Sequence, residues 1–151
     1  MLEGGIPYEN YLNLTALSFL MAFTRITIIS NTKPGSRNIN EELQWFGSSL
    51  GLFGLRDKDK SCFRVFIVLI KHTGKGLSSD DIAAMLNLTR GTVVHHLNKL
   101  MDSGIVVSER GKYLLRTNSL TELVAHMKKS VSQQLDELEK VAEDIDKRLQ
   151  S

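Results

Sequence analysis

The side chains with the most chemical potential are gathered in one short stretch, Thr89 to Lys99, where hydroxyl, amide, imidazole and cationic groups occur together. Arg and Lys pair with phosphate, whereas Thr, Asn and His can reach the edges of nucleic-acid bases. No acidic residue occurs from Ile82 to Met101 that would repel a polyanion. We therefore expect this stretch to contact DNA through Thr89, Arg90, Gly91, Thr92, His95, Asn98 and Lys99.

Two short helices are expected to position these groups. Ser78 is a suitable N-cap for the first helix, Asp81 takes the acidic place of a capping box, and the helix ends near Asn87. Thr89 is expected to cap the second helix, which ends at Gly104 in a left-handed C-cap. Helical spacing turns three apolar residues of the second helix inward, namely Val93, Leu97 and Leu100. Helices joined by so few residues cross steeply, as in a helix-turn-helix.

A β-hairpin is expected after the second helix. Residues 105–108 and 112–116 are rich in β-forming side chains and flank the turn sequence Glu-Arg-Gly at 109–111. The tip is basic, so Arg110 and Lys112 can contact the sugar-phosphate backbone beside the helix. Gly91 would let the backbone of the second helix approach DNA closely.

These residues carry a family resemblance. The segment LTRGTVVHHLNKL at 88–100, followed by DSGIVV at 102–107, resembles the recognition helix and wing entry of ArsR-like and MarR-like winged-helix transcription regulators of the archaeal type. The similarity spans roughly residues 58–117, under half of the chain. It implies a dimer whose two second helices enter successive major grooves. The matching positions are Arg90, Gly91, Thr92, His95 and Lys99, with Arg110 and Lys112 at the wing. Metal-sensing members carry thiolate ligands, whereas this chain has a single cysteine.

Composition is that of an ordinary globular protein, with 42% hydrophobic and 24% charged residues among 151. The net charge of +2 is unevenly distributed: −1 over residues 1–57, +5 over 58–116 and −2 over 117–151. Positive charge is thus concentrated where DNA binding needs it, although a solvated basic surface is the plain alternative. One cysteine excludes an intramolecular disulfide and favours a reducing, cytoplasmic location.

Residues 1–37 form an apolar segment and a linker. The mostly apolar run from Leu12 to Ile29 is expected to form a helix to about Phe23 and a strand-like piece from Ile26 to Ile29, packed on the domain or across a dimer. A membrane span is the alternative, but polar residues interrupt the run, and a span needs about 20 mainly apolar residues. A third possibility is that translation starts at Met21. The turn-rich linker 31–38 follows.

Two helices are expected between this linker and the helix-turn-helix. The first begins near Ile39, capped by Asn38 or Asn40, and has apolar residues at helical spacing, namely Leu43, Phe46, Leu50 and Phe53. The second runs from about Lys58 to His72, capped by Asp57, and is apolar on nearly all sides. Its main apolar face is expected to be Phe63, Phe66, Ile67 and Ile70, widened by Cys62, Val65 and Leu69. Leu77 is expected to form a short strand beside the wing.

The last segment, 118–151, is expected to be one long helix with a coiled-coil seam. Its apolar a and d positions are Leu120, Val124, Met127, Val131, Leu138, Val141 and Ile145. About 30 helical residues span about 45 Å, which is too long for so small a core to cover. A second copy of the helix is the simplest partner, and packing on its own domain is the alternative. Gln134 and Arg148 interrupt the seam and would set its register.

Metal and catalytic chemistry are not favoured. His95 and His96 are adjacent on a helix and so point about 100° apart, a poor arrangement for two ligands of one metal. We expect no metal site and no cofactor, a core position for Cys62, and a partly buried structural role for His96. The sequence contains no nucleophile elbow, phosphate loop or paired catalytic carboxylates, so we expect a chain that is not an enzyme.

The sequence therefore predicts a mainly α chain with a small β-hairpin wing, a winged helix-turn-helix with a long C-terminal dimerisation helix. We divide it into an N-terminal segment (1–37), a DNA-binding domain (38–117) and a coiled-coil helix (118–151). The predicted function is a homodimeric, sequence-specific transcription regulator whose partner is double-stranded DNA and that does not enter membranes. A winged-helix protein-interaction adaptor and a non-specific chromatin-type protein are the alternatives. An effector ligand is not identified by the sequence.

Overall fold

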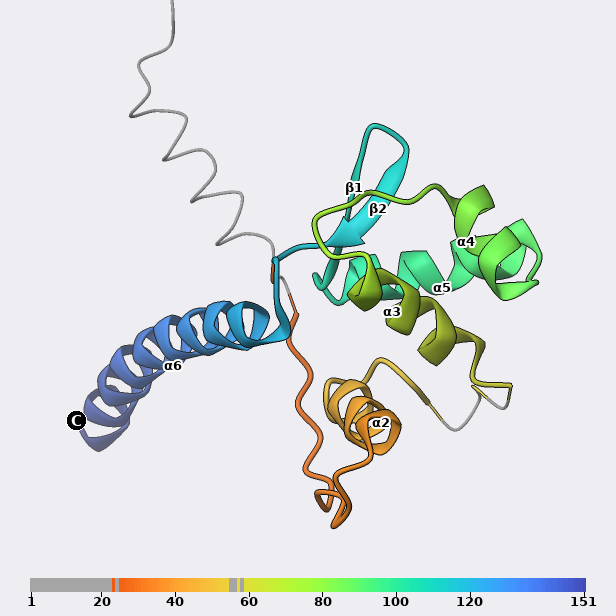
Figure 1. Cartoon of the computed structure of the whole chain (residues 1–151). Coiled ribbons are helices and arrows are strands. Elements are labelled where there is room, and N and C mark those ends of the chain that lie inside the picture. Colours follow the sequence, from red (N-terminus) through yellow and green to blue (C-terminus); the bar gives the residue numbers. More distant parts are fainter. Residues whose placement is uncertain (1–22, 24, 55–56, 58) are drawn as a thin grey trace, which may run out of the picture.

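The structure, a computed structural model, describes residues 23, 25–54, 57 and 59–151. It is mainly helical, with one two-stranded hairpin and a long C-terminal helix, which confirms the predicted fold class (Figure 1). The elements in chain order are α2 (Ile39–Ser49), α3 (Ser61–Lys71), α4 (Ser79–Leu86), α5 (Arg90–Asp102), β1 (Val106–Glu109), β2 (Lys112–Leu115) and α6 (Leu120–Gln150).

The core lies where α3, α4, α5 and the hairpin meet. Val93, Leu97 and Leu100 of α5 are fully buried there, as the sequence predicted. The most buried face of α3 differs from the predicted one, because the supposed flanking residues are the central ones: Cys62, Val65 and Leu69 are buried together with Phe66. Phe63, Ile67 and Ile70 are only partly buried. The reason is that α4, α5 and β2 all contact α3. The spacing of apolar residues within α3 does not predict where these three elements pack.

The predicted start of α3 at Lys58 was wrong. The helix begins at Ser61, because Lys60 adopts a left-handed conformation with φ of 55°, which no residue inside an α-helix has. Asp57 is therefore not the capping residue. Its carboxylate nevertheless accepts hydrogen bonds from the backbone N–H groups of Cys62 at 3.1 Å and Phe63 at 3.3 Å. Asp57 therefore provides acceptors for two N–H groups of the first turn, although it is not adjacent to the helix in sequence.

The hairpin is confirmed with slightly different bounds. Its strands pair antiparallel, from Val106 opposite Leu115 to Glu109 opposite Lys112. Arg110 and Gly111 form the two-residue turn with φ of 52° and 76°, the pair of positive values that a type I′ turn requires. The predicted strand at Leu77 is a single antiparallel bridge to Tyr113, with two backbone hydrogen bonds of 3.0 and 2.7 Å.

Helix α2 begins at the first of its two candidate caps. The side chain of Asn38 accepts a hydrogen bond from the N–H of Asn40 at 2.9 Å. Of the predicted apolar face of α2, Leu43 and Phe46 are partly buried, whereas Leu50 and the buried Phe53 lie beyond the end of the helix at Ser49. The buried residue within α2 is Gly47, against which the ring of Phe53 lies. Phe53 also packs edge-on against Phe63, with ring centroids 5.3 Å apart. Close approach at a glycine thus attaches α2 to the core.

Helix α6 begins against the core and then leaves it. Leu123 and Met127 are buried in the core of their own chain, and Leu120 packs against it. From position 132 onward every residue is exposed, and Figure 1 shows the helix, in blue, extending away from the other elements as a curved rod. Two predicted seam residues, Leu120 and Met127, therefore contribute to packing within the chain.

In the described part of the segment before α2, residues Ile26 to Ile29 form no strand, so the predicted strand-like piece is not formed. Among the described residues, this segment is joined to α2 by a backbone hydrogen bond from the N–H of Ile29 to the carbonyl of Ser49, at 2.7 Å. Phe23 is buried, with the Arg116 guanidinium 5.6 Å above its ring. The helix predicted up to Phe23 and the alternative start at Met21 lie outside the described residues. Among the helices that are described, none combines the length and the apolar character that crossing a membrane requires.

Candidate nucleic-acid interface

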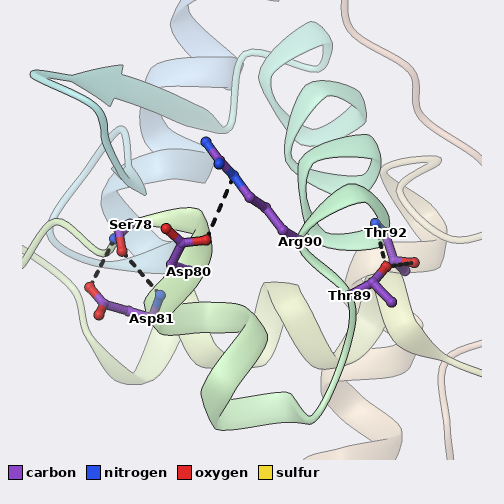
Figure 2. Close-up of polar contacts among 6 residues, drawn as sticks. All are labelled: Ser78, Asp80, Asp81, Thr89, Arg90 and Thr92. Atoms are coloured by element: carbon purple, nitrogen blue, oxygen red, sulfur yellow. Dashed lines mark hydrogen bonds and ion pairs between the residues drawn. The ribbon is translucent and has the colours of Figure 1, made fainter.

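The helix-turn-helix is built by local capping. The hydroxyl of Ser78 accepts the N–H of Asp81 at 3.0 Å, and the Asp81 carboxylate accepts the N–H of Ser78 at 3.2 Å, so the predicted capping box is complete (Figure 2). Asn87 ends α4 in the left-handed conformation, and Thr89 already caps α5. The connection between the two helices is therefore short, and it fixes their crossing.

The first turn of α5 is capped by Thr89, which also contacts the side chain of Thr92. The Thr89 hydroxyl oxygen accepts the backbone N–H of Thr92 at 3.2 Å and lies 2.8 Å from the Thr92 hydroxyl. The two side chains lie together at the start of the helix in Figure 2. Because a hydroxyl has one donor and two acceptor sites, Thr92 keeps hydrogen-bonding capacity for a further partner. Thr89 acts mainly as the cap, so its role as a DNA contact stays a prediction.

The outer face of α5 is open, as a groove-binding helix requires. Most of the predicted contact residues are exposed, namely Arg90, Gly91, His95, Asn98 and Lys99, and Thr92 is half buried. An added Cβ at Gly91 would meet no atom within 4 Å. The exposed residues therefore lie on the side of α5 opposite Val93, Leu97 and Leu100, which pack the helix against the core.

One residue of this surface was missed by sequence reasoning. The Asp80 carboxylate, in the first turn of α4, lies 3.6 Å from the Nε atom of Arg90, and the two side chains are 74% and 70% exposed. Figure 2 shows the Arg90 side chain reaching from the start of α5 to the start of α4. The predicted steep crossing of the two capped helices could have indicated this contact, because it brings their first turns together. Asp80 was overlooked because it lies just outside the acid-free stretch.

The wing presents its basic residues to solvent. Arg110 and Lys112 are both exposed, at the tip and at the start of β2. The loop before Leu77 lies close beneath β2, because an added Cβ at Gly76 would come within 2.8 Å of the Lys112 Cβ. The wing is therefore supported along one side by the chain that leads into α4, which positions Lys112.

His96 faces inward, in contrast to its neighbour His95. Its Nε2 atom lies 2.6 Å from the hydroxyl oxygen of Ser61 at the N-terminus of α3. Burial lowers the pKa of His96, with Asp57 opposing that effect. Its predicted structural role is confirmed by this contact.

Cys62 is a core residue and does not belong to this surface. Burial raises the pKa of the Cys62 thiol to about 11, and the side chain belongs to the core, as predicted. A thiol held protonated in this way is a poor nucleophile and metal ligand. Within the described residues, no cluster of three or more His, Cys, Asp or Glu side chains is arranged to hold a metal ion.

The predicted dimerisation residues fall into two groups. Leu120 and Met127 pack with the core of their own chain, and Val131 is half buried. The others are exposed along α6, namely Val124, Leu138, Val141 and Ile145. Leu135 and Leu149 are exposed as well. Large apolar side chains are therefore presented to solvent over much of the helix.

Comparison with known proteins identifies one family over the helix-turn-helix. Residues 69–108 match the family described as "Bacterial regulatory protein, arsR family", from the end of α3 through α4 and α5 into β1. This match confirms the ArsR-like resemblance, whereas the MarR-like and archaeal assignments stay predictions. Neither the curated proteins nor the solved structures compared with the chain contain a match.

Proposed function

We propose that the chain is a homodimeric transcription regulator that binds double-stranded DNA at specific sequences. The observation that carries this proposal is that the arsR-family match supports a DNA-binding regulator and falls on the two helices whose outer face is open. That face and the wing are basic, which suits the phosphate backbone. A regulator of this kind acts in the cytoplasm, needs no cofactor and is not an enzyme, and these assignments belong to the same proposal.

The residue roles follow from position and chemistry. Arg90 and Lys99 flank the exposed face of α5, and Arg110 and Lys112 lie on the wing, so we assign phosphate contacts to these four. Thr92, His95 and Asn98 lie between them and carry donors and acceptors for base edges, with Gly91 permitting close approach. Phosphate contacts give affinity for any sequence, while base contacts discriminate.

Homodimerisation is assigned to α6. The chain presents Val124, Leu138, Val141 and Ile145 to solvent on a helix of 31 residues, most of which extends beyond the core. Exposed apolar side chains at a and d positions are typical of a coiled-coil seam. A dimer would place two copies of α5 about one helical turn of DNA apart, so the binding site should contain two related half-sites.

A direct test is to map the sites that the chain occupies on chromosomal DNA, and then to measure binding of the purified chain to a mapped site and to its shuffled sequence. We expect the mapped site to bind at least about 1,000-fold more tightly at physiological salt. Equal affinities would indicate a non-specific chromatin-type protein. No binding to either duplex would favour a protein-interaction adaptor.

A further inference from the structure

The basic segment 58–116 contains five acidic residues, and two of them stand in the first turn of α4. Asp81 is used by the capping box. Asp80 is not part of that box, and its carboxylate faces the guanidinium of Arg90 at 3.6 Å. The start of the proposed DNA-reading helix is therefore paired with an anion from its own chain.

This ion pair is placed where DNA would compete for it. Both side chains are more than two-thirds exposed, so solvent and ions reach them, and such a pair contributes little to the stability of the fold. Arg90 is the first residue of α5, the end that enters a major groove in helix-turn-helix proteins. A phosphate that takes the guanidinium must approach the Asp80 carboxylate, and like charges repel.

We propose that Asp80 competes with DNA phosphate for the guanidinium of Arg90 and thereby lowers the affinity of the chain for the backbone of any duplex. The inference rests on the DNA-binding function proposed above. Its consequence is that base contacts of α5 account for a larger share of binding. Asp80 is in this sense a specificity-determining residue that itself touches no base.

The test is a double-mutant cycle on duplex binding with Asp80→Asn, Arg90→Gln and their combination. Asp102→Asn is the matched control, because it removes the same charge from an exposed side chain at the opposite end of α5. Binding of a shuffled duplex is measured by fluorescence anisotropy from low to physiological salt. Thermal unfolding is recorded for every variant.

We expect Asp80→Asn to tighten binding of the shuffled duplex by about two- to fivefold. We also expect a salt dependence steeper by up to about one unit of slope, because Arg90 then engages its phosphate without a competitor. The gain should largely vanish in the Arg90→Gln background and be smaller for Asp102→Asn. Loss of a favourable charge at the N-terminus of α4 should slightly lower the melting temperature, so tighter binding would not follow from a more stable fold.

Two results would overturn the inference alone. In one, the wild type binds DNA and Asp80→Asn binds no more tightly. In the other, the gain is equally large without Arg90, which would show a general charge effect. A wild type and an Asp80→Asn variant that both bind no duplex at low salt would instead reject the proposed function, and the inference with it.

Discussion

The hydroxyl of Ser61 and the Nε2 atom of His96 lie 2.6 Å apart and join the N-terminus of α3 to the middle of α5. Ser61 is 3% exposed and His96 is half buried, so the contact is partly shielded from solvent. His95, the preceding residue, is exposed on the outer face of the same helix. A bond that holds His96 inward therefore also sets the rotation of α5 about its axis and the direction in which His95 points.

The contact predicts a pH dependence of folding. Burial lowers the pKa of His96; His95 and Lys99 act in the same direction, and Asp57 and Asp59 oppose it. Below about pH 6.5 the imidazole of His96 therefore binds a proton more readily in the unfolded chain than in the folded one. The contribution of neutral His96 to the free energy of unfolding is complete above that pH and decreases as the pH falls below it. Urea unfolding from pH 8 to pH 5 measures this. His96→Gln should flatten the profile, while His95→Gln, the same change at the exposed neighbour, should flatten it only slightly, because burial lowers the pKa of His96 more than His95 does. Equal slopes for wild type and His96→Gln would contradict the assignment.

Variants that remove a base contact and variants that remove a phosphate contact should differ in how their DNA affinity depends on sequence and on salt concentration. Lys112→Ala should weaken a mapped site and a shuffled duplex alike and reduce the salt slope by about one. His95→Ala should weaken the mapped site by about five- to 150-fold, with little effect on the shuffled duplex. Lys147→Ala, which removes an exposed lysine near the end of α6, is the control and should change neither. Identical losses on both duplexes for Lys112→Ala and His95→Ala would refute the assigned roles.

The exposed seam of α6 should govern oligomeric state. Leu138 is 55% exposed and far along the helix from the core, so Leu138→Glu should leave the core folded and convert a dimer to a monomer. Ala125→Glu adds the same charge at an exposed position off the seam and should leave the dimer intact. Sedimentation equilibrium distinguishes the two states, and circular dichroism checks the fold. A wild type that is already monomeric at high concentration would reject the dimer, as would a Leu138→Glu variant that remains dimeric.

The parts of the fold that sequence predicted well depend on neighbouring residues. The Ser78 and Asp81 capping box, the Thr89 cap and the positive φ at Gly104 are each decided within a few positions of the chain. Alternation of inward and outward residues on α5 is local too, because it follows the helical period. The helical period therefore predicted most of the outer face of α5, although Thr92 is half buried.

The parts that sequence missed depend on contacts between distant segments. Which face of α3 is most buried depends on three other elements that contact it, and the left-handed Lys60 moved the start of this helix. Met127 fits the coiled-coil period and yet packs in its own core, since a period alone does not distinguish one apolar partner from another. The Asp80 and Arg90 pair likewise exists only because two helices cross.

Two glycines inside helices should respond oppositely to the same substitution, which tests both the packing of α2 and the approach of α5 to DNA. At Gly47 an added Cβ would lie 1.9 Å from an atom of the Phe53 ring, whereas at Gly91 it would meet nothing within 4 Å. Gly47→Ala should therefore destabilise the fold by about 1–3 kcal/mol, because a buried ring must move. Gly91→Ala should stabilise it by about 0.5–1 kcal/mol through helix propensity.

The same two variants should differ in DNA affinity in the opposite order to their stability. If Gly91 lies against the groove, its new methyl group holds the backbone of α5 away, and Gly91→Ala should bind a mapped site more weakly than the wild type although it is more stable. Gly47→Ala should bind normally at temperatures where it remains folded, because α2 carries none of the proposed contacts. Chemical unfolding and anisotropy on the same preparations give both quantities. Unchanged binding by Gly91→Ala would place the backbone of α5 too far from DNA for the proposed docking.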